Sequence, residues 1–305
     1  MNTLKITPIN EMLTERHNLE NAKVKTFEIK HKEYSFYTPC NLNIYMGPSC
    51  NCHCKFCFAD ALNHQKDIND SFFLESLERN LELLEEIPIE VTITGGEPTL
   101  YTKRLLMVMD LLKERNIPER TFSTNGIGLM STFSGKPMLQ HMKEHGILHN
   151  ISVSRMAAEE RENKDIFCGD CISNHEIARI SEFTKINRMD MRLSSVLMDS
   201  GLNSWEKIKN YISFYESIGI ESFIFREIVG QQVKIKMEEI VSEMLKEKDV
   251  EFLKSMDGIF YTIMIYKRKH HLLKHYIQKE GNRDIVSTLV FHNGILYRNW
   301  NGDKI

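Results

Sequence analysis

The chain has 305 residues, 42% of them hydrophobic, which is enough for one large domain or two small ones with a buried core. Its 39 basic and 42 acidic residues give a formal net charge of −3, so charge gives no support to a nucleic-acid-binding protein. Because we see no apolar leader and no run of eighteen apolar residues, we expect no signal peptide, no membrane-spanning helix and a cytoplasmic location.

Strand and helix patterns alternate along most of the chain, after a polar lead-in over residues 1–39. Alternating apolar and polar residues predict the strands, and apolar residues three or four apart predict the helices. We expect Asp70 or Ser71 to cap the first helix and Pro88 to stop it. The strands are expected to begin near residues 42, 89, 119, 148, 190 and 221, with helices near 73–84, 105–117, 138–145, 177–186 and 205–219.

This alternation repeats about every thirty residues and predicts parallel strands joined by right-handed crossovers. We therefore predict an α/β fold, a partial (β/α)6 TIM-like barrel over residues 40–230. A polar stretch over 158–171 is predicted as a long loop. In such folds the functional residues lie at the carboxyl ends of the strands.

The pattern changes in the last part of the chain, residues 231–305, where we predict a C-terminal α+β extension. It comprises a charged helix over 237–253, a strand over 259–266, and a β-hairpin over 286–300 that turns at Asn293-Gly294.

Four of the seven cysteines lie within residues 50–57, which argues for a reduced compartment and a metal site. Cys50, Cys54 and Cys57 have the spacing C-x3-C-x2-C. A structural zinc site and a cubane iron–sulfur cluster each take four ligands, so three cysteines leave one metal position open for a substrate or cofactor. Cys40 and Cys52 do not fit this spacing, and we predict that they are packing residues.

With these cysteines, the chain resembles the radical S-adenosylmethionine (SAM) superfamily over residues 40–230. The motifs that carry the resemblance are the three cysteines with Phe56 before the last, Gly95-Gly96-Glu97-Pro98, Ser123-Thr124-Asn125-Gly126 and Val153-Ser154. The resemblance implies that Cys50, Cys54 and Cys57 hold one 4Fe–4S cluster whose open iron binds SAM. One electron, from a donor such as flavodoxin or ferredoxin, would cleave SAM to a 5′-deoxyadenosyl radical that abstracts hydrogen from the substrate.

The resemblance also implies the contacts with SAM. Gly95 and Gly96 would let the backbone approach the methionyl ammonium, which Glu97 or nearby carbonyls would hold. Phe56 would lie by the adenine. The ribose or methionyl carboxylate would contact Ser123, Asn125 and Ser154; Arg155 would pair with a carboxylate, and Arg192 and Ser194 would face SAM or substrate.

The motifs leave the substrate open. We favour a small-molecule or nucleotide-like substrate, because no cysteine-rich segment follows Cys171 and the charge is near neutral. A radical SAM enzyme that modifies peptides is the first alternative. A second is a binding protein stabilised by zinc on Cys54, Cys57, Cys168 and Cys171, which would leave Cys50 and the Gly95 loop unexplained.

Two further features stay open. The pair Cys168 and Cys171 could bind zinc, hold an auxiliary cluster, form a redox disulfide, or be plain thiols. The basic segment 266–275 is either a solvated helix face or a contact for a phosphate, a carboxylate or an acidic electron donor.

Overall fold

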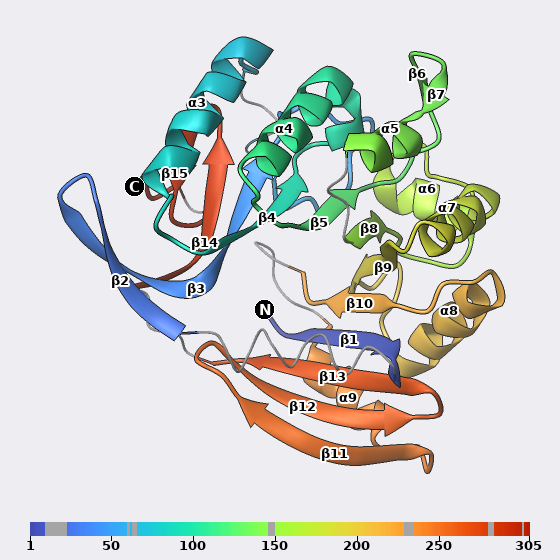
Figure 1. The fold of residues 1–305 in the computed structure, drawn as a ribbon. Helices are drawn as coiled ribbons and strands as arrows, with labels where there is room; N and C mark the ends of the chain where they lie inside the picture. The colour runs from blue at the N-terminus through green and yellow to red at the C-terminus, as the bar shows by residue number, and fades with distance from the viewer. Residues whose placement is uncertain are drawn as a thin grey trace. The chain divides into compact units, whose positions relative to one another are not determined.

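The structure is a computed structural model that describes residues 1–9, 23–59, 62, 66–145, 150–228, 235–279, 284–300 and 302–305. It has two compact units, which we describe separately (Figure 1). Unit 1 comprises Met1–Glu20, Cys52–Phe58 and Ser152–Gly281, and unit 2 comprises Asn21–Asn51, Ala59–Ile151 and Asn282–Ile305.

The sheet of unit 2 has the strand order β5-β4-β3-β14-β15, and β2 pairs with β3. β14 and β4 both run parallel to β3, and β5 runs parallel to β4. Figure 1 shows the red β14 beside the blue β3, so both ends of the chain contribute to this sheet. The strands are β2 Lys23–Ile29, β3 Lys32–Tyr45, β4 Ile89–Thr94, β5 Glu119–Thr124, β14 Ile285–His292 and β15 Ile295–Tyr297, with the small hairpin β6 Thr132–Phe133 and β7 Lys136–Pro137.

Helices follow the parallel strands of unit 2: α3 Asp70–Leu83, the 3-10 helix η2 Pro98–Tyr101, α4 Thr102–Glu114 and α5 Met138–His145. The predicted apolar stripe of α3 is buried, and the Phe73 ring meets that of Phe291 edge-on at 5.1 Å. The predicted cap was wrong by one residue, because the side chain of Asn69 accepts the hydrogen bond from Phe72 N. Gly146, expected just past α5, lies outside the described residues.

The sheet segment of unit 1 has the order β11-β12-β13-β1-β10-β9-β8. β9 and β10 are parallel, whereas β1 pairs antiparallel with both β10 and β13 (Figure 1). Its elements are β1 Thr3–Pro8, β8 Asn150–Ser154 (which begins in unit 2), α6 Glu160–Phe167, α7 Asn174–Ile186, β9 Asp190–Val196, α8 Trp205–Ser217, β10 Phe223–Arg226, α9 Met237–Met244, β11 Val250–Asp257, β12 Tyr261–Arg268 and β13 His271–Gln278.

One face of this sheet forms an apolar core with α8. Leu4 and Phe225 are fully buried on neighbouring strands, and Phe223 is 1% exposed. The Tyr211 ring of α8 lies 6.0 Å from that of Phe223 and 5.8 Å from that of Phe225, both edge-on. The other face is mixed: it carries the basic side chains described below and the buried apolar cluster of Ile263, Ile265 and Leu272.

The predicted α/β class with parallel strands is confirmed. The lead-in contains β1, whose buried Leu4 and Ile6 belong to the core. Two local predictions were wrong. The stretch 158–171 contains α6, where the buried Asn163 side chain accepts hydrogen bonds from Met156 N and Ala157 N. The helix expected over 237–253 ends at Met244, because the segment from Val250 pairs with β12 as a strand.

Two predictions concern turns near the C-terminus. The hairpin around Asn293-Gly294 is confirmed, and both residues have the positive φ (48° and 79°) that a type I′ turn requires. The basic segment is not a helix face but the β12–β13 hairpin, in which Lys274 and His275 are buried. None of the helices in the described part of the chain has the length and apolarity to cross a bilayer.

Candidate functional site

The three motif cysteines follow β3, Cys50 in unit 2 and Cys54 and Cys57 in unit 1. All three are outside disulfide bonds and have intermediate exposure. A turn in which Cys57 N donates to Cys54 O, at 3.1 Å, links the last two. Soft thiolates from reduced, accessible cysteines suit iron–sulfur chemistry, so the donor set fits the expected cluster.

In unit 1 the cysteine segment rests on the end of α6. His53 N donates to Phe167 O at 2.9 Å, and the rings of Phe56 and Phe167 lie 6.2 Å apart. Cys52 is 5% exposed, and its thiol lies 3.5 Å from Asp170 O. Its burial agrees with the predicted packing role. Cys40, the other cysteine predicted to pack, is fully buried in unit 2, where burial raises the pKa of its thiol to about 12.

In unit 2 the Gly-Gly-Glu loop packs against the backbone that leads into Cys50. Gly96 N donates to Gly47 O at 2.9 Å, and Glu97 N donates to Ser49 O at 2.8 Å. A Cβ on Gly96 would lie 2.3 Å from Ser49 O, which no side chain tolerates. Glycine is therefore required here by backbone packing. The predicted approach to the methionyl ammonium stays a prediction.

The Glu97 carboxylate ties together the ends of β4 and β5. It is 1% exposed, and its Oε1 accepts from Thr99 N at 3.0 Å, Thr99 Oγ1 at 2.7 Å and Thr124 Oγ1 at 2.7 Å. Its Oε2 accepts from Asn125 N at 2.8 Å. Burial raises the pKa of this carboxyl, and the hydrogen bonds oppose that shift. Glu97 thus orders the loops, and its predicted role toward the ammonium is not tested.

The loop after β5 also reaches the cysteine segment. Asn125 Nδ2 donates to Asn51 Oδ1, beside Cys50, at 2.6 Å, and Asn125 Oδ1 accepts from Ile127 N at 3.1 Å. Ser123 lies on β5 with intermediate exposure. The side chains predicted from two strand ends are therefore brought together within unit 2.

In unit 1, Ser154 ends β8 with intermediate exposure, whereas Arg155 is fully buried. The Arg155 guanidinium donates to Tyr215 Oη at 2.6 Å, Ile172 O at 2.8 Å and Asn174 Oδ1 at 2.8 Å. These bonds connect β8, α8 and the start of α7. The predicted pairing of Arg155 with a carboxylate stays a prediction, and the side chain has a structural role in this arrangement.

Arg192 and Ser194 lie on the same face of β9, opposite the buried Leu193. Arg192 Nε donates to Ser152 Oγ at 3.3 Å. Ser194 Oγ accepts a bond from Arg226 of the neighbouring β10. Sequence reasoning missed Arg226, although its position at the carboxyl end of a predicted strand was a usable signal.

A model of the radical SAM superfamily matches residues 44–186, which contain the three cysteines and the loops that follow β4, β5 and β8. Residues 44–186 therefore form a radical SAM domain. This family of enzymes uses SAM and an iron–sulfur cluster.

The relatives differ in how much of them the chain covers. A GTP 3′,8-cyclase of Aquifex aeolicus is 22% identical over 244 residues, which are 79% of this chain and 72% of the relative. An S-adenosylmethionine-dependent nucleotide dehydratase of Flammeovirga pacifica is 31% identical over 99 residues, 30% of this chain and 32% of the relative.

Among solved structures, SuiB of Streptococcus suis bound to its precursor peptide SuiA superposes with a TM-score of 0.51 at 18% identity. The match covers 68% of this chain and 46% of SuiB. It shows the fold and is consistent with the predicted partial TIM-like barrel.

Sequence reasoning missed Arg104, which anchors the segment after the radical SAM cysteines in unit 2. It is 3% exposed and donates to Asp70 Oδ1 at 2.8 Å, Asp67 Oδ1 at 3.0 Å, Ile68 O at 2.6 Å and Met46 O. Its guanidinium also lies over the ring of Phe73. An arginine among the apolar residues of the predicted helix was the signal available in the sequence.

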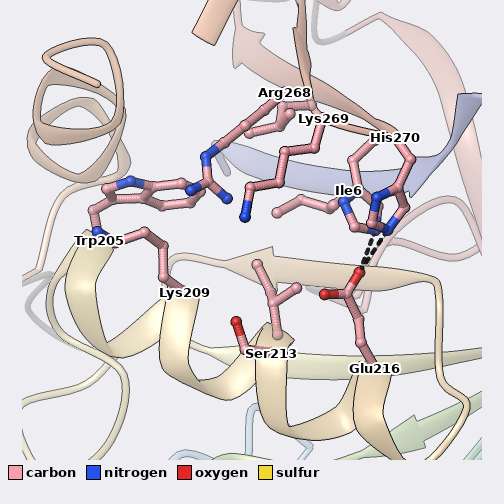
Figure 2. A pocket seen from close by; sticks show the side chains of 11 residues that line it. Ile6, Trp205, Lys209, Ser213, Glu216, Arg268, Lys269 and His270 are labelled. Atoms are coloured by element: carbon pink, nitrogen blue, oxygen red, sulfur yellow. Dashed lines mark hydrogen bonds and ion pairs between the residues drawn. The ribbon is translucent and has the colours of Figure 1, made fainter. Parts of the chain in front are cut away.

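Unit 1 also has a small polar pocket between α8 and the β12–β13 hairpin (Figure 2). There, His270 Nε2 and His271 Nε2 lie 3.0 and 2.8 Å from Glu216 Oε1. Burial lowers the pKa of His271. This pocket belongs to none of the radical SAM motifs.

The zinc alternative needs four thiols around one ion. Among the described residues, Glu216, His270 and His271 are the set of three metal-ligating side chains whose atoms lie within 4.8 Å of one another, and the four cysteines do not form such a set. Cys168 is exposed, and its thiol contacts Asp165 O at 3.6 Å. In the described part of the chain, Cys50, Cys54 and Cys57 do not form such a set either, so this distance criterion does not decide between the zinc site and the iron–sulfur cluster.

Proposed function

We propose that the protein is a radical SAM enzyme that cleaves SAM reductively and abstracts hydrogen from a small-molecule or nucleotide-like substrate. The observation that carries the proposal is the network in unit 2, where Glu97 and Asn125 connect the ends of β4 and β5 with Asn51, next to Cys50. The buried polar side chains of this network hold the backbone next to Cys50 in a fixed position.

Cys50, Cys54 and Cys57 would hold one 4Fe–4S cluster. When bound, the cluster and SAM supply the electron-transfer and radical chemistry. The chain positions SAM through Phe56, Gly95, Gly96, Ser123, Asn125 and Ser154. Glu97 fixes the loops that carry these groups. A one-electron donor such as flavodoxin or ferredoxin completes the proposal.

The names of two relatives support a nucleotide-like substrate, because one is a cyclase of GTP and the other a nucleotide dehydratase. The alternative of a peptide substrate rests on SuiB, whose likeness concerns the fold alone. We therefore rank the nucleotide-like substrate first.

The test begins with the full chain purified anaerobically and reconstituted with iron and sulfide. This protein should be brown before any reductant is added. With dithionite and SAM it should form 5′-deoxyadenosine, measured by liquid chromatography and mass spectrometry. Cys54→Ala should lose cluster and product together, whereas the matched control Cys168→Ala should keep both. Colourless protein with stoichiometric zinc, or product formation by Cys54→Ala, would overturn the proposal.

A further inference from the structure

One face of the sheet in unit 1 carries four basic side chains on four adjacent strands. The register pairs Ser194 of β9 with Ile224 of β10, Ile224 with Lys5 of β1, and Lys5 with Lys274 of β13. Paired residues point to the same face of a sheet, and so do residues two apart on one strand. Arg192, Arg226, Lys5 and Lys274 therefore share the face opposite to the apolar core under α8.

The two arginines of this basic face lie close to each other. Arg226 has intermediate exposure and donates to Ser194 Oγ. Burial, followed by the positive charge of Arg192, lowers the pKa of Arg226 to about 10. The proximity of two like charges in a partly buried place is unfavourable for the folded protein.

The two lysines extend the basic face across β1 and β13. Lys274 is 3% exposed, and Lys5 Nζ lies 4.5 Å from the centre of the Tyr276 ring. Lys5 and Lys274 thus add two cations to the face that carries Arg192 and Arg226.

Acidic side chains on the same strands do not neutralise Arg226. Glu227 follows it, but this carboxylate accepts bonds from Asn2 N at 3.1 Å and Met237 N at 2.9 Å. Within the part of the chain that the structure describes, no carboxylate forms an ion pair with Arg226. Its neighbours are the hydroxyl of Ser194, the guanidinium of Arg192 and the phenol of Tyr261.

We propose that this basic face binds the phosphate groups of the substrate, a small molecule that carries two or more of them. This inference rests on the proposed function, since it names the class of substrate. Adjacent strands lie about 4.8 Å apart, so the side chains from β9 to β13 start from backbones spread over roughly 14 Å. A single carboxylate would meet one or two of them, whereas a polyphosphate can contact several. Arginine binds phosphate through paired N–H groups, and lysine binds it as a point charge.

Calorimetric titration of the reconstituted full chain tests this proposal, with inorganic tripolyphosphate as the probe and citrate as a tricarboxylate comparison. Arg226→Gln should weaken tripolyphosphate binding at least tenfold. Lys185→Gln, which removes an exposed cation from α7 of the same unit, should change it less than twofold. Unchanged binding by Arg226→Gln, or equal binding of citrate, would overturn the inference.

Two further measurements keep the test interpretable. Thermal unfolding without ligand should show that Arg226→Gln is no less stable than the original chain, because the substitution removes a repelled charge. Should that variant fail to fold, Arg192→Lys keeps the charge but loses the paired N–H groups, and it should weaken binding on its own. The proposed function is tested separately, by assaying SAM cleavage in the absence of substrate. If the protein cleaves SAM but does not bind tripolyphosphate, this inference alone is refuted. If it binds tripolyphosphate but does not cleave SAM, the proposed function is refuted.

Discussion

Gly96→Ala tests whether the backbone contact behind the radical SAM cysteines is required. The new Cβ would lie 2.3 Å from Ser49 O and 2.8 Å from Pro48 O, both backbone atoms that no side-chain rotation can move. Relief requires a shift that strains the hydrogen bonds Gly96 N to Gly47 O and Glu97 N to Ser49 O. Overpacking costs about 1–3 kcal/mol and each of the two weakened hydrogen bonds about 0.5–1.5 kcal/mol, so we expect a loss of about 2–6 kcal/mol in the free energy of unfolding.

The assay is urea denaturation followed by circular dichroism, together with the iron content of the reconstituted protein. Gly135→Ala is the control, because nothing lies within 4 Å of the Cβ that it adds; unlike Gly96, Gly135 has a positive φ of +82°, which disfavours alanine. The control should lose about 1 kcal/mol from backbone strain and keep its iron. Gly96→Ala should lose more stability and bind less iron. An equal loss in both variants, with iron retained, would refute the packing argument.

Three other predictions concern buried polar groups. Glu97→Gln places an amide N–H₂ where an acceptor is needed, so one buried donor loses its partner. The free energy of unfolding, measured in urea, should fall by about 1–3 kcal/mol. An unchanged midpoint of the urea transition would contradict the role of Glu97 in the network. Arg104→Lys keeps the charge but lacks the several N–H donors of the guanidinium, and it should lower the melting temperature and the iron content together. A destabilised variant with normal iron content would show that Arg104 is not needed for the cluster site. Burial lowers the pKa of His271, His275 and His292 below 6.5, so at acidic pH the unfolded chain binds more protons than the folded chain. The free energy of unfolding should therefore fall as the pH drops below about 6.5, by up to ~1.4 kcal/mol per pH unit for each histidine. Urea midpoints at pH 7.5 and 5.5 measure this fall, which His271→Gln should reduce; a midpoint independent of pH would contradict it.

The strand and helix order was predictable because it depends on local periodicity. The alternation of Val91 and Ile93 with polar residues identified β4, and Asn293-Gly294 identified the last hairpin. Pairing over long distances was not predictable in this way. β1 is short, and its partners β10 and β13 lie more than two hundred residues away in the sequence. Its place in the core therefore could not be predicted from the residues around it. The strand β11 was mistaken for helix for the same reason.

The sequence by itself predicted the radical SAM chemistry, since the spacing of Cys50, Cys54 and Cys57 and the glycines after β4 depend on residue types at neighbouring positions. Only the tertiary structure decided what the polar residues near them contact. It buried Glu97 and Arg155 in hydrogen-bond networks, and it brought the charge of Arg192 on β9 near Arg226 on the neighbouring β10. The physical reason is that burial and like-charge proximity are properties of strands and helices brought together by folding, and no local spacing encodes them.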